Sequence, residues 1–99
     1  MSKQINLSVN DKPIVLDYFV HKFIDHTIGG MLTSLEGIGE IENLDLSIDE
    51  AGQVTVNLNN ALVPINLFVN EIIKSTVTGM LSPLKGVSEV NKVNISIRS

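Results

Sequence analysis

Two histidines and a carboxylate stand together in the segment HKFIDH, residues 21–26. On a helix, His21 and Asp25 would lie one turn apart on the same face, whereas His26 would lie about 100° further round. Imidazole and carboxylate groups suit zinc or nickel, but this spacing does not let both histidines reach one ion easily, and the HExxH arrangement is absent. We interpret the segment as a solvated helix face, and we predict neither a metal site nor a cofactor.

The acidic residues Glu40 and Glu42, together with Glu89, are a second candidate for chemistry. Paired carboxylates act in acid–base catalysis when a desolvated cleft separates their pKa values. Here they stand in a connector beside glycine, where solvated loop charges are the favoured explanation. The chain also has no cysteine, no glycine-rich phosphate loop and no nucleophile elbow. We therefore predict that it is not an enzyme.

Short polar side chains that alternate with apolar residues form a third candidate. The period of two predicts that they share one face of a sheet, and they define a candidate interaction surface: Asn6, Ser8, Asp45, Ser47, Thr55, Asn57, Asn94 and Ser96. RNA-binding sheets use exposed aromatic residues, and this face has none. Solvent exposure is the favoured explanation. The alternative is a surface that binds another protein, a second copy or a small polar ligand.

These candidates lie within an internal repeat. Residues 4–48 align with residues 53–97 at a constant offset of 49, and 14 of the 45 aligned pairs are identical. A unit of about 45 residues buries too little surface to fold alone without a staple or a partner. We expect residues 1–99 to form a single domain in which the two repeats share one core.

Each repeat predicts the same order of elements. Alternating apolar residues predict strands near 5–9, 44–48, 54–58 and 93–97. The pairs Asn10-Asp11 and Asn59-Asn60 suit tight hairpin turns. Short returning strands at 14–16 and 63–65 would follow these turns, at sheet edges because of Pro13 and Pro64.

A helix is predicted after Asp17 and after Asn66, since either side chain can cap a first turn. The apolar residues of each helix recur in steps of three and four and were assigned to one core stripe: Phe19, Val20, Phe23, Ile24, Ile28, Met31, Leu32 and Leu35, then Phe68, Val69, Ile72, Ile73, Val77, Met80, Leu81 and Leu84. Gly37 and Gly86 are predicted helix stops. Pro83 predicts that the second helix bends or ends early.

The resulting fold class is α+β. We predict a two-layer sandwich with an internally duplicated βαβ-βαβ order and both helices on one face of the sheet, which is the ferredoxin-like plan or a close variant with extra short edge strands. Whether the sheet has four or six strands is left open by the sequence.

Glycines recur within both helices, at Gly30 and Gly79. Glycine costs about 1 kcal/mol relative to alanine inside a helix. Close approach of helix to helix or helix to sheet is the favoured reason, and a backbone opening for a ligand is the alternative. Tyr18 and Leu67 stand outside the apolar stripe, and edge packing is favoured for them over a dimer seam.

Several strings resemble short uncharacterised prokaryotic proteins that carry a single such unit: Val9 to Ile14, the pair Phe19-Val20, and Thr27 to Gly37. The resemblance carries over no functional residue. It implies a single-unit ancestor that paired as a homodimer, of which this chain would be the fused form.

Composition narrows the possible partners. The net charge is −4, and the seven basic residues are scattered, which argues against nucleic acid. No apolar run reaches the length of a membrane span, and residues 1–6 lack the apolar stretch of a secretory signal, so we expect a cytoplasmic protein.

We therefore expect a small protein-binding or self-assembly module with pseudo-twofold symmetry, which uses the polar sheet face or exposed strand edges to contact a protein partner or a second copy. A small-molecule or metal-binding regulatory domain is the alternative, by analogy of fold alone.

Overall fold

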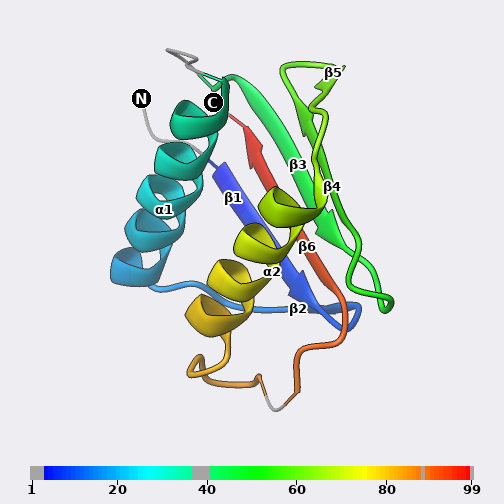
Figure 1. Cartoon of the computed structure of the whole chain (residues 1–99). Coiled ribbons are helices and arrows are strands. Elements are labelled where there is room, and N and C mark those ends of the chain that lie inside the picture. Colours follow the sequence, from blue (N-terminus) through cyan, green and yellow to red (C-terminus); the bar gives the residue numbers. More distant parts are fainter. Residues whose placement is uncertain (1–3, 37–40, 88, 99) are drawn as a thin grey trace.

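A computed structural model describes residues 4–36, 41–87 and 89–98 of the chain. One antiparallel sheet of six strands forms one layer, and two helices cover a single face of it (Figure 1). The class is α+β, as predicted. The elements in chain order are β1 (Gln4–Val9), β2 (Lys12–Pro13), α1 (Tyr18–Glu36), β3 (Asn43–Ile48), β4 (Val54–Leu58), β5 (Ala61–Leu62), α2 (Leu67–Leu81) and β6 (Val93–Arg98).

The strands lie in the order β2-β1-β6-β3-β4-β5. The closing strands β6 and β3 occupy the centre and pair antiparallel over six residues each, from Asn43 opposite Arg98 to Ile48 opposite Val93. In the ferredoxin-like plan the opening strands of the two halves occupy the centre instead, so the ferredoxin-like order is not confirmed. The six-stranded form, with two short edge strands, is the one observed.

Tight turns join β1 to β2 and β4 to β5. Asn10, Asp11, Asn59 and Asn60 have positive φ angles of 52°, 66°, 48° and 69°. Asparagine and aspartate tolerate this left-handed region better than other non-glycine residues, which is why these pairs specify the hairpins.

The returning strands are shorter and earlier than predicted. Only Lys12–Pro13 and Ala61–Leu62 pair as strands. After each of them one more hydrogen bond follows before the pairing ends. The Ile14 N–H donates to the Leu7 carbonyl at 2.9 Å, and the Val63 N–H donates to the Val56 carbonyl at 2.9 Å. Pro13 lies on an edge strand as expected. Pro64 lies beyond β5, so the edge argument made for it was wrong.

Both helices begin where the capping residues predict. The Val20 N–H donates to Asp17 Oδ1 at 2.8 Å, and the Val69 N–H donates to Asn66 Oδ1 at 2.8 Å. Helix α2 ends early, at Leu81, two residues before Pro83, as predicted. Gly86 has a φ of 87° but belongs to a later turn, so its assignment as the stop of α2 was wrong. Gly37 lies outside the described residues.

The core lies between the sheet and the inner sides of the helices. It is aliphatic throughout, and no polar or charged residue within the described ranges is buried. Among the helix side chains that the structure describes, three on each helix are buried: Ile24, Ile28 and Leu32 on α1, and Ile73, Val77 and Leu81 on α2.

The predicted core stripe was too wide. Val20, Met31, Val69, Met80 and Leu84 are partly buried against the core, but Phe19, Phe23, Phe68 and Ile72 are exposed. Phe19 and Phe68 each precede a fully buried residue, Ile28 and Val77, by nine positions, which places them about 180° away on the helix. A single sheet cannot cover both sides of a helix. Leu35 lies outside the described side chains.

Candidate functional site

The sheet face that faces away from the helices carries all eight polar residues of the candidate interaction surface. Strand pairing arranges them in two rows across the four long strands: Asn6, Ser96, Asp45 and Asn57 in one row, and Ser8, Asn94, Ser47 and Thr55 in the other. Ser8, Ser47 and Ser96 are half-buried, and the other five are exposed. The placement therefore follows the prediction, while the binding role assigned to this face stays a prediction.

One ion pair crosses the sheet face. The Arg98 Nη2 donates to both carboxylate oxygens of Asp45, at 3.0 and 3.1 Å, and Nη1 donates to the Leu44 carbonyl at 3.0 Å. The sequence analysis included Asp45 but not Arg98. A shallow hollow of about 420 Å³ extends from this face over the β1 edge, with Asn6, Asp45 and Asn94 in its lining. Hydroxyls, amides and a satisfied ion pair make this surface well suited to water.

The histidine and acidic candidates that the structure describes lie on α1 and in the segments that lead into β3 and β6. His21 and Asp25 are half-buried on α1 and have partners within the chain, while His26 is exposed. Glu42 and Glu89 are exposed, and Glu40 lies outside the described residues. Within ranges 4–36, 41–87 and 89–98, no cluster of three histidine or acidic side chains could hold a metal ion.

Large apolar side chains are instead exposed on the helices. Tyr18, Phe19, Leu67 and Phe68 are 71–79% exposed, and Phe23 and Ile72 are 48% and 44% exposed. We call these six residues the helix surface. They include all three phenylalanines and the only tyrosine of a chain without tryptophan. No aromatic side chain is therefore in the core.

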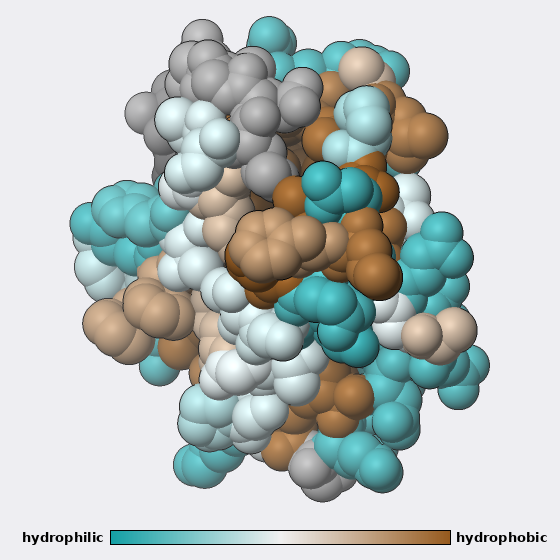
Figure 2. Space-filling model, viewed as in Figure 1, coloured by the Kyte–Doolittle hydropathy of each residue, from teal (hydrophilic) through white to brown (hydrophobic). Residues whose placement is uncertain are grey.

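The helix surface is partly ordered by its own contacts. The rings of Phe19 and Phe23 stack with centroids 6.0 Å apart and planes 15° apart, and the Lys22 ammonium lies 5.4 Å from the centre of the Tyr18 ring. Figure 2 looks onto this side of the molecule and shows apolar side chains exposed among polar ones. The aromatic residues are held in place but remain in contact with solvent.

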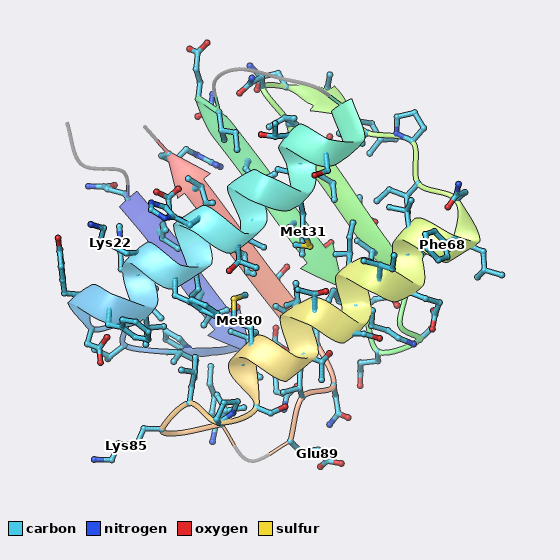
Figure 3. The ribbon with its side chains drawn as sticks, turned by 60° about the vertical axis from the view of Figure 1, so that its left-hand side comes forward. Lys22, Met31, Phe68, Met80, Lys85 and Glu89 are labelled. Atoms are coloured by element: carbon cyan, nitrogen blue, oxygen red, sulfur yellow. The ribbon has the colours of Figure 1, made fainter. Side chains whose placement is uncertain are left out.

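An apolar cavity of about 290 Å³ lies between the two helices beside this surface. It is lined by Met31, Ser34, Phe68, Val69, Ile72 and Ile73. Figure 3 shows Met31 of α1 and Met80 of α2 in the space between the helices, with Phe68 at the start of α2. Methionine is flexible and polarisable, so the wall that Met31 forms adapts to what covers it.

The two mid-helix glycines lie on the exposed side of the helices. A Cβ atom added at Gly30 or at Gly79 would meet no atom within 4 Å. Close packing inside the chain, the favoured sequence explanation, was therefore wrong for both positions. The glycines instead leave open space on the outer face of each helix.

The helix surface was not predicted as a unit. For Tyr18 and Leu67 edge packing was favoured over a dimer seam, but at 78% and 79% exposure they pack against little else in the chain. One signal could have found the site. Tyr18, Phe19 and Phe23 each have an apolar counterpart 49 positions later, and all six residues lie away from the buried side of the helix, which is centred on Ile28 and Val77.

Comparison with known proteins finds no matching family, no similar curated protein and no similar solved structure. Neither helix, over the residues described, is long and apolar enough to cross a membrane.

Proposed function

We propose that this chain is a small protein-binding or self-assembly module and that its binding surface is the helix surface. One observation carries the proposal: all four aromatic residues, with Leu67 and Ile72, are exposed on the two helices. Aromatic residues are enriched in the cores of protein interfaces and dominate their energetics.

The size of the helix surface supports this role. An aromatic side chain can bury about 150–250 Å², so the exposed fractions of the six residues together amount to about 700 Å² of mostly apolar area. Because the two helices run in opposite directions, this area is divided between two clusters, one at the start of each helix (Figure 1). One side of a standard protein interface is about 800 Å².

The sheet face offers a weaker driving force. Its short polar side chains are exposed or half-buried, and its Arg98–Asp45 ion pair is satisfied. A partner there would have to replace each hydrogen bond to water and would gain little from apolar burial. This shifts the proposed contact from the sheet face or the strand edges, which were predicted from the sequence, to the helices.

We also infer that the chain is one unit duplicated and fused. The element bounds support this, since β2 and β5 lie 49 residues apart, as do the four turn residues with positive φ. Asn10 Oδ1 accepts from the N–H groups of Asn91 and Lys92, and Asn59 Oδ1 accepts from those of Glu42 and Asn43. These partners also lie 49 positions apart. The two halves thus support each other reciprocally, as two subunits of a dimer would.

The test compares association by three forms of the full chain in a native extract, by size-exclusion chromatography with native mass spectrometry. Wild type is expected in a complex with itself or with another protein. The variant Phe19→Glu/Phe68→Glu, whose side chains are exposed, should lose the complex. The sheet-face variant Asn57→Lys/Ser96→Lys is the matched control and should keep it. The reverse pattern, or no complex at all, would refute the proposal.

The cavity between the helices supports a second candidate, a small-molecule-binding regulatory domain. Its volume of about 290 Å³ lies at the lower limit of ligand pockets, and its lining is almost entirely apolar. An apolar molecule of fixed mass retained by gently purified protein in native mass spectrometry would favour this function. Loss of that mass in an Ile72→Trp variant, which would fill the cavity, would locate the ligand there.

A further inference from the structure

We infer that the partner of the helix surface is a second copy of this chain, packed helices against helices so that the aromatic half of each helix lies over the glycine half of a helix in the other copy. The inference rests on the proposed binding role of the helix surface. It adds the identity of the partner and the way in which the two surfaces fit.

The outer side of each helix combines bulk and open space. On α1, Phe19, Phe23 and Gly30 lie on the same solvent-exposed side of the helix. On α2, Phe68, Ile72 and Gly79 do the same. Phe23 and Gly30 are seven residues apart, as are Ile72 and Gly79, which is about 10 Å along the helix axis. Each helix therefore has a protruding first half and an open second half.

The two helices run in opposite directions, α1 upward and α2 downward in Figure 1. Two copies stacked face to face are related by a twofold axis in the plane between them. If that axis runs along the helices, α1 lies antiparallel over α2 of the other copy. If it runs across them, α1 lies antiparallel over α1 of the other copy. In both arrangements the protruding half of one helix meets the open half of another.

The open halves allow close approach. Helices pack with their axes about 8–10 Å apart, depending on the side chains at the contact. A side chain at position 30 or 79 would project into the space that the facing aromatic ring must enter. Both glycines lower helix stability, and a Cβ atom at either position would contact nothing within the chain. Close packing between two copies would explain why glycine is present there.

Charge on this side also permits self-contact. Among the side chains described on the helices, α1 carries Lys22 and Asp25, and α2 carries Glu71 and Lys74, so each helix has one charge of each sign. Glu36, the last residue of α1, adds one negative charge, and the other −3 of the net charge of −4 lies outside the helices. Two copies can therefore approach through this face with little like-charge repulsion, whereas the acidic chain as a whole is repelled by an anionic lipid surface.

The area also fits a dimer. About 700 Å² of mostly apolar surface on each copy, in two clusters that both lie on the helix side, is close to the area of one side of a standard interface, for which dissociation constants range from micromolar downward. The contact is closed, because each copy uses the surface that the other presents. It leaves no second helix surface for further growth.

The first experiment is sedimentation equilibrium of the purified full chain up to about 100 μM, well above the dissociation constants of standard interfaces. Wild type and Asn57→Lys/Ser96→Lys should have twice the chain mass, and Phe19→Glu/Phe68→Glu should have the mass of one chain. A monomeric wild type would overturn the inference. If that monomeric chain still forms a Phe-dependent complex in extract, the proposed binding function survives. Binding of the monomer to phosphatidylcholine vesicles would likewise overturn the inference in favour of a lipid surface.

The second experiment tests the fit at the glycines. Gly30→Gln/Gly79→Gln should raise the dimer dissociation constant at least about tenfold, which corresponds to about 1.4 kcal/mol. Gly30→Ala/Gly79→Ala is the matched control. Both variants remove the helix cost of glycine and should fold at least as well as wild type, which circular dichroism would check. Only the longer side chains should block approach, so equal dissociation constants for the Gln variant and wild type would overturn the proposed packing.

Discussion

Replacement of Asn10 by alanine should destabilise the fold by about 2 to 3 kcal/mol. The side chain accepts from the N–H groups of Asn91 and Lys92, each at 2.9 Å, and donates to the Glu89 carbonyl at 2.6 Å. Each lost hydrogen bond costs about 0.5–1.5 kcal/mol, and these groups are exposed, so the lower part of that range applies. Alanine must also adopt the φ of 52°, which costs a residue with a Cβ about another 1 kcal/mol.

Urea unfolding followed by circular dichroism measures this loss. Asn10→Gly is the matched control, because it loses the same hydrogen bonds but adopts a positive φ without strain. It should be destabilised by about 1 kcal/mol less than the alanine variant. Asn59→Ala, which removes bonds of 2.8 and 3.0 Å to Glu42 and Asn43 at a φ of 48°, should match Asn10→Ala within about 1 kcal/mol.

Two results would refute the reasoning. A loss below about 1 kcal/mol for Asn10→Ala would mean that water replaces these hydrogen bonds without cost. Equal losses for the alanine and glycine variants would mean that the left-handed backbone is not what selects asparagine. Strongly unequal effects at Asn10 and Asn59 would count against the inferred duplication.

Three further predictions concern the core, the sheet face and the end of α2. Ile28→Ala should lower the free energy of unfolding by about 2–5 kcal/mol in the same urea assay, because Ile28 is fully buried, whereas Val15→Ser, at a site 97% exposed, should change it by less than about 0.5 kcal/mol. Asp45→Asn should cost less than about 1 kcal/mol, since its ion pair with Arg98 is about half exposed, and a larger loss would show that the pair is coupled to the sheet. Pro83→Ala should extend α2 and increase the helical circular dichroism signal at 222 nm; an unchanged signal would show that proline is not what ends the helix.

Local chemistry accounts for the elements that the sequence predicted well. The alternation in the long strands, the asparagine pairs at the turns and the capping residues Asp17 and Asn66 each act over a few neighbouring positions. The strand order was not accessible in the same way. The order depends on which strands of the two halves pair at the centre of the sheet. The alternation of apolar and polar residues within each strand is the same whichever strands are neighbours.

The helix surface was missed for a different reason. Steps of three and four residues join Phe19, Phe23 and Ile24 into an apparently continuous stripe, although Phe19 and Ile24 lie about 140° apart on the helix. Periodicity alone cannot say how wide an arc the sheet covers. The mid-helix glycines were misread for the same reason, because a glycine favours close approach on either side of a helix, and only the structure shows that Gly30 and Gly79 face outward.

The proposed dimer also explains why the sheet face is polar while the helix side carries exposed apolar residues. With both helix layers inside, the assembly presents only its two sheet faces to solvent, and these carry the short polar side chains and the Arg98–Asp45 pair. Half-buried serines and exposed asparagines are suited to such an outer surface. They form hydrogen bonds with water and offer little apolar area to a third chain. The same argument explains why the aromatic residues are concentrated on the helices. An interface built from Phe19, Phe68 and their neighbours would exclude water, and the aliphatic core contains none of these residues.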